Sequence, residues 1–218
     1  FTFASLPDEP TLDFVIKTYP DHDGVTEQIP SLEPGDTVTI KDVWGAIQYK
    51  GDGVFIAGGA GVTPFIAILR DKLARDGALD GNTLVYSNTA ERDIILRDTF
   101  EGMPGLTCHW TVTDQENSPL AHGKIDHSML EQYVDPDATI CYICGPDRDR
   151  RRSLTAQNHW PGSISPRSSN CRECHSNIVE LCQRNVWMSK VDPGLLFSAF
   201  AVRNDAMAHV RLLCHGQA

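Results

Sequence analysis

The stretch Val54-Phe-Ile-Ala-Gly-Gly-Ala-Gly-Val-Thr-Pro64 decides the fold of this chain. Its four leading apolar residues predict a short buried strand, and its glycines predict a tight turn. Pro64 suits the first turn of a helix, and apolar residues then recur at helical spacing at Phe65, Ile66, Leu69 and Leu73. Glycines let the backbone approach a pyrophosphate, and a helix N-terminus favours its charge. The stretch therefore predicts a nucleotide-binding loop, and the alternative is a turn with a purely structural role.

Strands and helices alternate on the carboxyl side of this loop. Further strands are predicted at 83–86, 106–112 and 139–143, and helices at 64–75, 93–100 and 128–133. Asp126 is the expected N-cap of the last helix. This alternation predicts an α/β nucleotide-binding domain, with a parallel sheet and crossover helices.

Short strands and turns precede the loop. The segments Thr11–Lys17 and Thr37–Ile40 are rich in β-branched residues, and Glu33-Pro-Gly-Asp36 between them has turn chemistry. Residues 1–50 therefore predict part of an antiparallel β-barrel or sandwich.

Charge divides the chain into two parts. Residues 1–146 hold 9 lysines and arginines against 23 aspartates and glutamates, a net charge of −14, whereas residues 147–218 hold 10 against 6, a net charge of +4. The overall charge of −10 argues against a nucleic-acid partner, because phosphate neutralisation needs a basic surface. No apolar run reaches the ~18 residues that a membrane span needs. Seven cysteines without regular spacing favour a reducing compartment, so we expect a cytoplasmic protein.

Two motifs, Gly59-Ala-Gly-Val-Thr-Pro64-Phe65 and Cys144-Gly-Pro146, resemble the ferredoxin–NADP reductase superfamily, in particular its flavodoxin/ferredoxin reductase and oxygenase-reductase branch. Each motif follows a predicted strand, and the resemblance covers residues 1–146. It implies a partial FAD-binding β-barrel at 1–50 and an NAD(P)-binding α/β domain at 51–146. Residues 147–218 stay unassigned, and we expect an irregular or poorly ordered tail there.

The resemblance also implies which residues bind NAD(P)H. The pyrophosphate loop would be Gly59, Ala60, Gly61, Val62, Thr63 and Pro64. Cys144 would be the catalytic residue, placed beside the nicotinamide ring and followed by Gly145 and Pro146. Ser87, Asn88 and Arg92 would lie near the adenosine end of the nucleotide, where NADP-specific members carry an arginine; the asparagine here favours NADH. Cys141 and Cys144 form a Cys-x-x-Cys by count, but in a strand they would point to opposite faces, so we expect no metal or dithiol pair.

The flavin would be held by residues near the amino terminus. Phe1 and Thr2 resemble the second half of the family's flavin motif, whose arginine and about half of whose barrel would lie upstream. Gly24-Val25-Thr26 is similar to the loop that caps the FAD pyrophosphate; taken alone, it reads as a turn before a helix.

The resemblance implies a flavin-dependent oxidoreductase. It would pass a hydride from NAD(P)H to FAD and then electrons to a ferredoxin, flavodoxin or oxygenase-type acceptor. A non-catalytic nucleotide-binding remnant is the alternative. The charge of −14 would repel an acidic acceptor at long range.

The tail contains one motif of its own. Cys171-Arg-Glu-Cys174-His175 matches the pattern of covalent haem attachment, and with Cys182 it could form a zinc site. A c-type haem protein is therefore a second alternative. We favour a third interpretation, that the tail is an out-of-frame or unrelated sequence, because it begins where the resemblance stops.

Overall fold

The structure, a computed structural model of the 218-residue chain, divides into two compact units, Phe1–Ala46 with Arg184–Ala218 and Ile47–Gln183. It describes residues 1–19, 21, 23–38, 47–135 and 139–145, together with the backbone of 197–204 and 207–214. Each unit is considered by itself below. Among the described residues, no helix combines the length and the apolar character that crossing a membrane requires.

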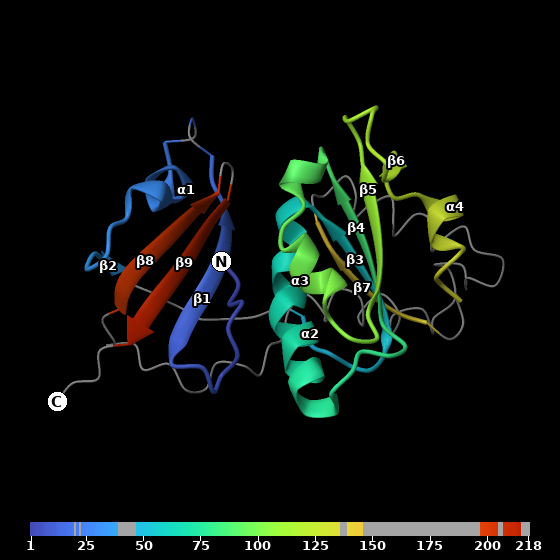
Figure 1. The fold of residues 1–218 in the computed structure, drawn as a ribbon, viewed down its shortest axis with the longest axis horizontal. Coiled ribbons are helices and arrows are strands. Elements are labelled where there is room, and N and C mark those ends of the chain that lie inside the picture. Colours follow the sequence, from blue (N-terminus) through green and yellow to red (C-terminus); the bar gives the residue numbers. More distant parts are fainter. Residues whose placement is uncertain are drawn as a thin grey trace, which may run out of the picture. The chain divides into compact units, whose positions relative to one another are not determined.

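The first unit is built on an antiparallel sheet of four strands, in the order β1-β9-β8-β2 (Figure 1). Its strands are β1 (Thr11–Lys17), β2 (Thr37–Val38), β8 (Phe197–Asn204) and β9 (Met207–Cys214). The short helix α1 (Val25–Gln28) and the 3-10 turn η1 (Ile29–Ser31) lie between β1 and β2 in the sequence. The predicted strand at 11–17 is confirmed, whereas Thr39 and Ile40 lie outside the described residues.

Residues 197–214 differ from the irregular tail that we expected. β8 and β9 pair along their whole lengths, from Phe197 with Cys214 to Asn204 with Met207, and β9 also pairs with β1. The sequence carries the reason, because apolar residues at Ala208, Val210, Leu212 and Cys214 alternate with the period of a strand. The last segment of the chain therefore supplies half the strands of the first sheet.

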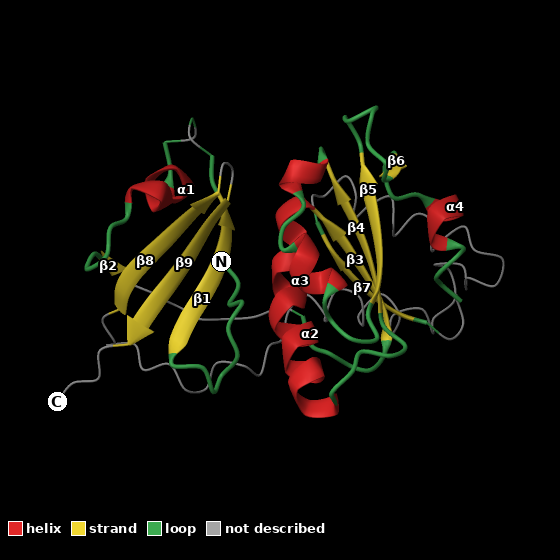
Figure 2. Ribbon diagram, in the orientation of Figure 1, coloured by secondary structure: helices red, strands yellow, loops and turns green. Residues whose placement is uncertain are grey.

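The second unit is the predicted α/β domain, with a parallel sheet in the order β6-β5-β4-β3-β7. Its strands are β3 (Gly53–Gly58), β4 (Thr83–Asn88), β5 (Thr107–Val112), β6 (Ala121–His122) and β7 (Ile140–Cys144). The helices are α2 (Thr63–Asp76), α3 (Arg97–Glu101) and α4 (His127–Leu130), with 3-10 turns η2 (Gly59–Val62) and η3 (Glu91–Asp93). Figures 1 and 2 show α2 and α3 on one face of the sheet and α4 on the other.

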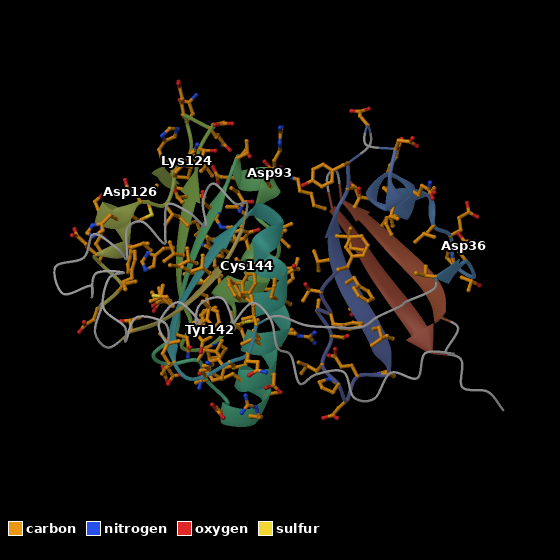
Figure 3. The ribbon with its side chains drawn as sticks, turned by 180° about the vertical axis from the view of Figure 1, so that it is seen from behind. Asp36, Asp93, Lys124, Asp126, Tyr142 and Cys144 are labelled. Atoms are coloured by element: carbon orange, nitrogen blue, oxygen red, sulfur yellow. The ribbon has the colours of Figure 1, made fainter. Side chains whose placement is uncertain are left out.

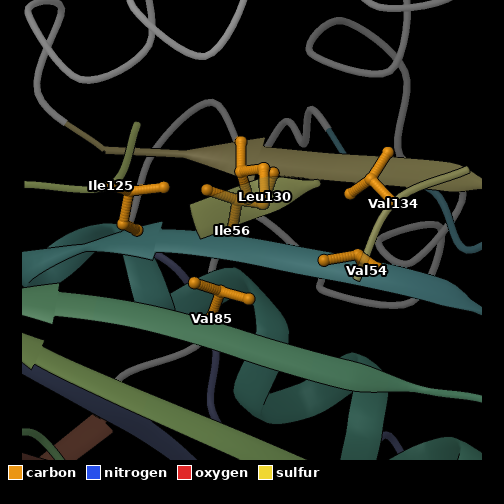
Figure 4. Close-up of a cluster of buried hydrophobic side chains, with 6 residues drawn as sticks. All are labelled: Val54, Ile56, Val85, Ile125, Leu130 and Val134. Carbon is orange, nitrogen blue, oxygen red and sulfur yellow. The ribbon is translucent and has the colours of Figure 1, made fainter. Parts of the chain in front are cut away.

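The core of this domain lies on both faces of β3, whose six residues are all buried. On the α4 face, Val54 and Ile56 pack in a cluster completed by Val85, Ile125, Leu130 and Val134 (Figure 4). On the α2 face, the ring of Phe55 stacks on Tyr142 at 4.5 Å and meets Phe65 edge-on at 5.1 Å. Burial on both faces explains why β3 reads as a continuous apolar run.

Two local details bear on the sequence predictions. Asp126 caps α4 as expected, because its side chain accepts a hydrogen bond from the backbone N–H of Met129. The single helix predicted over 93–100 is instead split into η3 and α3. Leu96 adopts a left-handed conformation with φ of 53° at the break, so the helix cannot run through it.

Candidate nucleotide-binding site

The glycine loop lies at the point where the chain order of the parallel sheet reverses. β3 has β4 on one side and β7 on the other, so the chain leaves β3 in one direction and later returns to its opposite edge. Open α/β sheets bind ligands outside the carboxyl ends of their strands at such a point. The loop Gly59–Val62 follows β3 there, and Cys144 and Gly145 end β7 beside it.

The glycines of this loop are required for different reasons. Gly59 has a φ of 51°, in the left-handed region that favours glycine, with open space where a Cβ would lie. Gly61 packs against the end of β7, and a Cβ there would lie 2.2 Å from the carbonyl oxygen of Cys144 and 2.7 Å from Gly145 Cα. The loop backbone therefore touches the backbone of β7 directly, which leaves the peptide groups of η2 and the start of α2 unobstructed by side chains at Gly59 and Gly61.

The loop continues directly into α2. Pro64 lies in the first turn of that helix, where its missing N–H costs no hydrogen bond. The hydroxyl of Thr63 donates to the carbonyl oxygen of Ala60 at 3.0 Å and so is satisfied within the loop. The first turn of a helix leaves backbone N–H groups without intrahelical partners, and an anion is their natural ligand. This arrangement fits a pyrophosphate.

Cys144 is half-buried at the carboxyl end of β7 (Figure 3). Alternation along the strand gives it the same face as Tyr142, whereas Cys141 packs against the cluster on the α4 face. Cys108, Cys141 and Cys144 are not joined in disulfides, and burial raises the pKa of Cys108 to about 11. The Cys-x-x-Cys count therefore does not correspond to a pair of neighbouring thiols.

The three expected adenosine-end residues lie at or just after the end of β4, which Ser87 and Asn88 complete. Ser87 is half-buried, and Arg92 is exposed in η3. Asn88 is buried, with 6% of its surface exposed, and its Nδ2 has no hydrogen-bond partner within the described residues. The structure thus brings Ser87, Asn88 and the glycine loop to one edge of the sheet, while Pro146 lies outside the described residues.

The expected flavin residues belong to the first unit. Phe1 is 73% exposed, and Thr2 is half-buried. Gly24 is the N-cap of α1, and Val25, the first residue of that helix, is 64% exposed while Thr26 follows it. The contacts described for these segments are local, such as the hydrogen bond from Glu27 N–H to the Gly24 carbonyl.

Comparison with known proteins, like the geometry of the glycine loop, indicates a nucleotide-binding domain. Residues 55–148 match the family of oxidoreductase NAD-binding domains. The solved cytochrome b5 reductase domain of Ulva prolifera nitrate reductase is similar, with a TM-score of 0.55 and 25% identity over 67% of this chain and 64% of that one. The family match and this structural neighbour support the ferredoxin–NADP reductase superfamily, which the two sequence motifs resemble.

Curated relatives of this reductase superfamily carry two kinds of name. NADH-cytochrome b5 reductase 2 of Mycosarcoma maydis is 35% identical over an alignment of 148 residues. The alignment covers 62% of this chain and 42% of that protein. Nitrate reductase [NADH] 1 of Oryza sativa subsp. japonica is 30% identical over 67% of this chain and 20% of its own length. The chain thus spans less than half the length of these relatives.

The family match and the structural neighbour support FAD and NAD(P)H as the cofactors, as expected from the sequence. The residues of the glycine loop fit the nucleotide donor. The backbone cradle at Gly59 and Gly61 suits a pyrophosphate. The large hydrophobic side chains that stay exposed in the described residues are all in the first unit, and two of them, Phe1 and Val25, occupy expected flavin positions.

Sequence reasoning missed Tyr86, which the structure places beneath the glycine loop. Its side chain is fully buried, and its hydroxyl donates to the carbonyl oxygen of Gly59 at 2.8 Å. An aromatic residue within an apolar strand reads as core, so only the alternation of Leu84, Tyr86 and Asn88 on one face could have pointed to it.

A second missed group holds η3 in place. The carboxylate of Glu91 accepts hydrogen bonds from Ser118 Oγ at 2.7 Å and Gln115 Nε2 at 3.1 Å. Gln115 also accepts from the Glu91 N–H at 2.9 Å, and Arg97 pairs with Glu91 at 3.3 Å. These contacts tie the segment that carries Arg92 to the loop after β5.

The alternative motif of the tail, with Cys171, Cys174, His175 and Cys182, lies outside the described residues. Within the part that the structure describes, no three His, Cys, Asp or Glu side chains are gathered as metal ligands.

Proposed function

We propose that this chain is the NADH-binding part of an FAD-dependent oxidoreductase that transfers electrons to a haem protein. The observation that carries the proposal is the direct backbone contact between Gly61 and the Cys144–Gly145 strand end at the switch point of the sheet. It leaves a cradle of peptide groups at the start of α2 beside a half-buried thiol. A turn with a purely structural role would not explain why the cradle of peptide groups and the thiol lie at the same edge of the sheet.

In this proposal each end of the nucleotide meets different residues. The N–H group of Ala60 would face the pyrophosphate, and the dipole of α2 favours its charge. Thr63 and Pro64 set the entry into the helix. Cys144 lies beside the nicotinamide, where a small side chain lets the ring lie flat against a second ring.

NADH rather than NADPH is proposed as the donor. Recognition of a 2′-phosphate is best served by a free arginine fork. Arg92 is exposed, but Ser87-Asn88-Thr89 contains no cation, and Arg97 is already paired with Glu91 and Glu101. The names of both relatives quoted above specify NADH.

When bound, FAD accepts a hydride and can release its electrons singly, which a nicotinamide cannot do. Phe1 and Thr2 would contact the flavin ring, and Gly24, Val25 and Thr26 would contact its phosphates. The role of this chain is to bind the two cofactors and keep water from the ring that receives the hydride.

For the acceptor we propose a cytochrome b5-like haem protein, because one relative is named for that activity. The charge of residues 1–146 also disfavours an acidic ferredoxin or flavodoxin. Cys108, Cys141 and Cys144, among the residues that the structure describes, form no disulfide, which is consistent with a reducing compartment such as the cytosol.

The test uses the full chain incubated with FAD. NADH oxidation is followed with ferricyanide, cytochrome b5, ferredoxin or flavodoxin as acceptor, and NADPH serves as the competing donor. We expect turnover with NADH and cytochrome b5 to exceed the other pairs. Reduction of ferredoxin or flavodoxin in preference to cytochrome b5 contradicts the acceptor, and nucleotide binding without any turnover indicates a non-catalytic remnant.

The variant Cys144→Ala separates chemistry from binding. Because the thiol would touch the nicotinamide but not the pyrophosphate, we expect kcat to fall about tenfold from poorer ring placement. The affinity for ADP-ribose, which lacks the nicotinamide, should stay unchanged. Equal loss of both would show that Cys144 supports the loop rather than the ring.

A further inference from the structure

We propose that the hydroxyl of Tyr86 is a positioning group of the nucleotide site, which fixes the orientation of the glycine loop after β3. The inference rests on the proposed function, since it concerns the same ligand. It assigns to a core residue a role that neither its position in a strand nor its full burial suggests.

Tyr86 contacts the glycine loop directly. Its hydroxyl donates a hydrogen bond to the Gly59 carbonyl oxygen at 2.8 Å. The ring is fully buried and packs against Trp110 at a centroid distance of 5.9 Å. The phenol therefore has little freedom to follow a moving loop.

The bond to Gly59 sets the direction of the next peptide group. A trans peptide is planar, so its C=O and N–H point in opposite directions. Because Tyr86 draws the Gly59 carbonyl toward the core, the N–H of Ala60 is turned away from the core. That N–H is among the donors proposed for the pyrophosphate.

Gly59 needs such a restraint because its own packing supplies little. No atom lies within 4 Å of the place where a Cβ would be, and glycine at φ of 51° has access to many other conformations. The restraint also persists across the neutral pH range, since burial raises the pKa of Tyr86 to about 12 and keeps the hydroxyl protonated.

The chain contains a matched control at the other end of the sheet. Tyr142 is 1% exposed, and its hydroxyl accepts from the N–H of Lys50 at 2.8 Å and donates to the Gly51 carbonyl at 2.8 Å. Those partners precede β3, so they lie at the amino ends of the strands, away from the proposed ligand. Tyr86→Phe and Tyr142→Phe each remove a buried hydroxyl that donates to a loop carbonyl, and the Tyr142 hydroxyl also accepts from the Gly51 N–H at 3.1 Å.

The experiment measures the affinity of the full chain and both variants for ADP-ribose and NADH by titration calorimetry, with thermal unfolding of each. Loss of one hydrogen bond that orients a binding loop should weaken ADP-ribose binding about fivefold to tenfold in Tyr86→Phe. We expect Tyr142→Phe to lose similar thermal stability and to bind within about twofold of the wild type. In turnover, KM for NADH should rise in Tyr86→Phe while kcat changes little.

Several results would overturn the inference. If the wild type binds and the two variants retain equal affinities, Tyr86 has no special role and the proposed function still stands. If the wild type binds neither ligand, the proposed function fails and the inference fails with it. If Tyr86→Phe does not fold, hydrogen exchange of the wild type decides, because ADP-ribose must then protect the amide of Ala60, and an unprotected Ala60 amide overturns the inference.

Discussion

Replacing Gly61 by alanine tests the contact on which the nucleotide site depends. The added methyl group would lie 2.2 Å from the Cys144 carbonyl oxygen, 2.5 Å from its carbonyl carbon and 2.7 Å from Gly145 Cα. These are backbone atoms of a central sheet, so no side chain can rotate away. The loop and the end of β7 must separate by about 1 Å to reach ordinary contact distances of 3.5 Å or more.

We expect this overpacking to lower the free energy of unfolding by about 3 kcal/mol, at the upper end of small-to-large changes in tight sites. A shift of that size also misdirects the loop amides, so ADP-ribose affinity should fall about a hundredfold. Urea unfolding and titration calorimetry of the full chain measure the two effects.

Gly77→Ala is the matched control. Gly77 ends α2 with φ of 80° and has open space where a Cβ would lie. Alanine there should cost about 1 kcal/mol for the left-handed backbone and leave ADP-ribose affinity unchanged. If Gly61→Ala is as stable as Gly77→Ala and binds ADP-ribose normally, the close approach of loop and strand does not exist in solution.

Three further predictions concern the second unit. Hydrogen bonds from Tyr49, Asn82 and Lys72 hold the pKa of Asp52 at about 2, below its ordinary 3.8. Stability from this carboxylate is therefore full above pH 4 and is lost as pH falls toward 2. The side chain of Asp52 is half-exposed, so the effect is small. In urea titrations, the drop in unfolding free energy from pH 5 to pH 2 should be about 1 kcal/mol smaller in Asp52→Asn than in the wild type. Asp126→Ala should cost about 1 kcal/mol by removing the α4 cap, with Asp126→Ser restoring most of it in the same assay. Leu130→Ala should cost about 3 kcal/mol because Leu130 is 3% exposed in the core cluster; a loss below 1 kcal/mol would mean that α4 does not pack on β3.

Local pattern was sufficient to predict the parallel domain. The apolar run at 54–57, the glycines and the helical spacing after Pro64 are all short-range signals, and β3, η2 and α2 appear where they indicated. The split helix was not predictable in this way, because Leu96 is a good helix former and the run is interrupted by its left-handed φ and by the extended backbone of Ile94.

The position of the glycine loop could be predicted from the sequence, whereas the hydrogen bonds that hold the loop and η3 could not. The loop could be predicted from the residue type at Gly59 and Gly61, because few residues other than glycine tolerate such backbone positions. The hydrogen bond from Tyr86 to Gly59 joins residues 27 positions apart, and no spacing rule relates them. The same holds for Glu91 with Ser118, 27 positions apart, where tertiary folding creates the contact.

The pairing of β1 with β9 has a consequence for synthesis on the ribosome. Lys17 finds its partner only when Met207 has been made, 190 positions later, whereas every strand of the parallel sheet is complete by Cys144. Since β9 and β8 stand between β1 and β2, a nascent chain that stops short of them leaves the first strand without its neighbour. The parallel domain is thus free to fold while the chain is still growing, and the N-terminal segment must wait for the last residues to emerge.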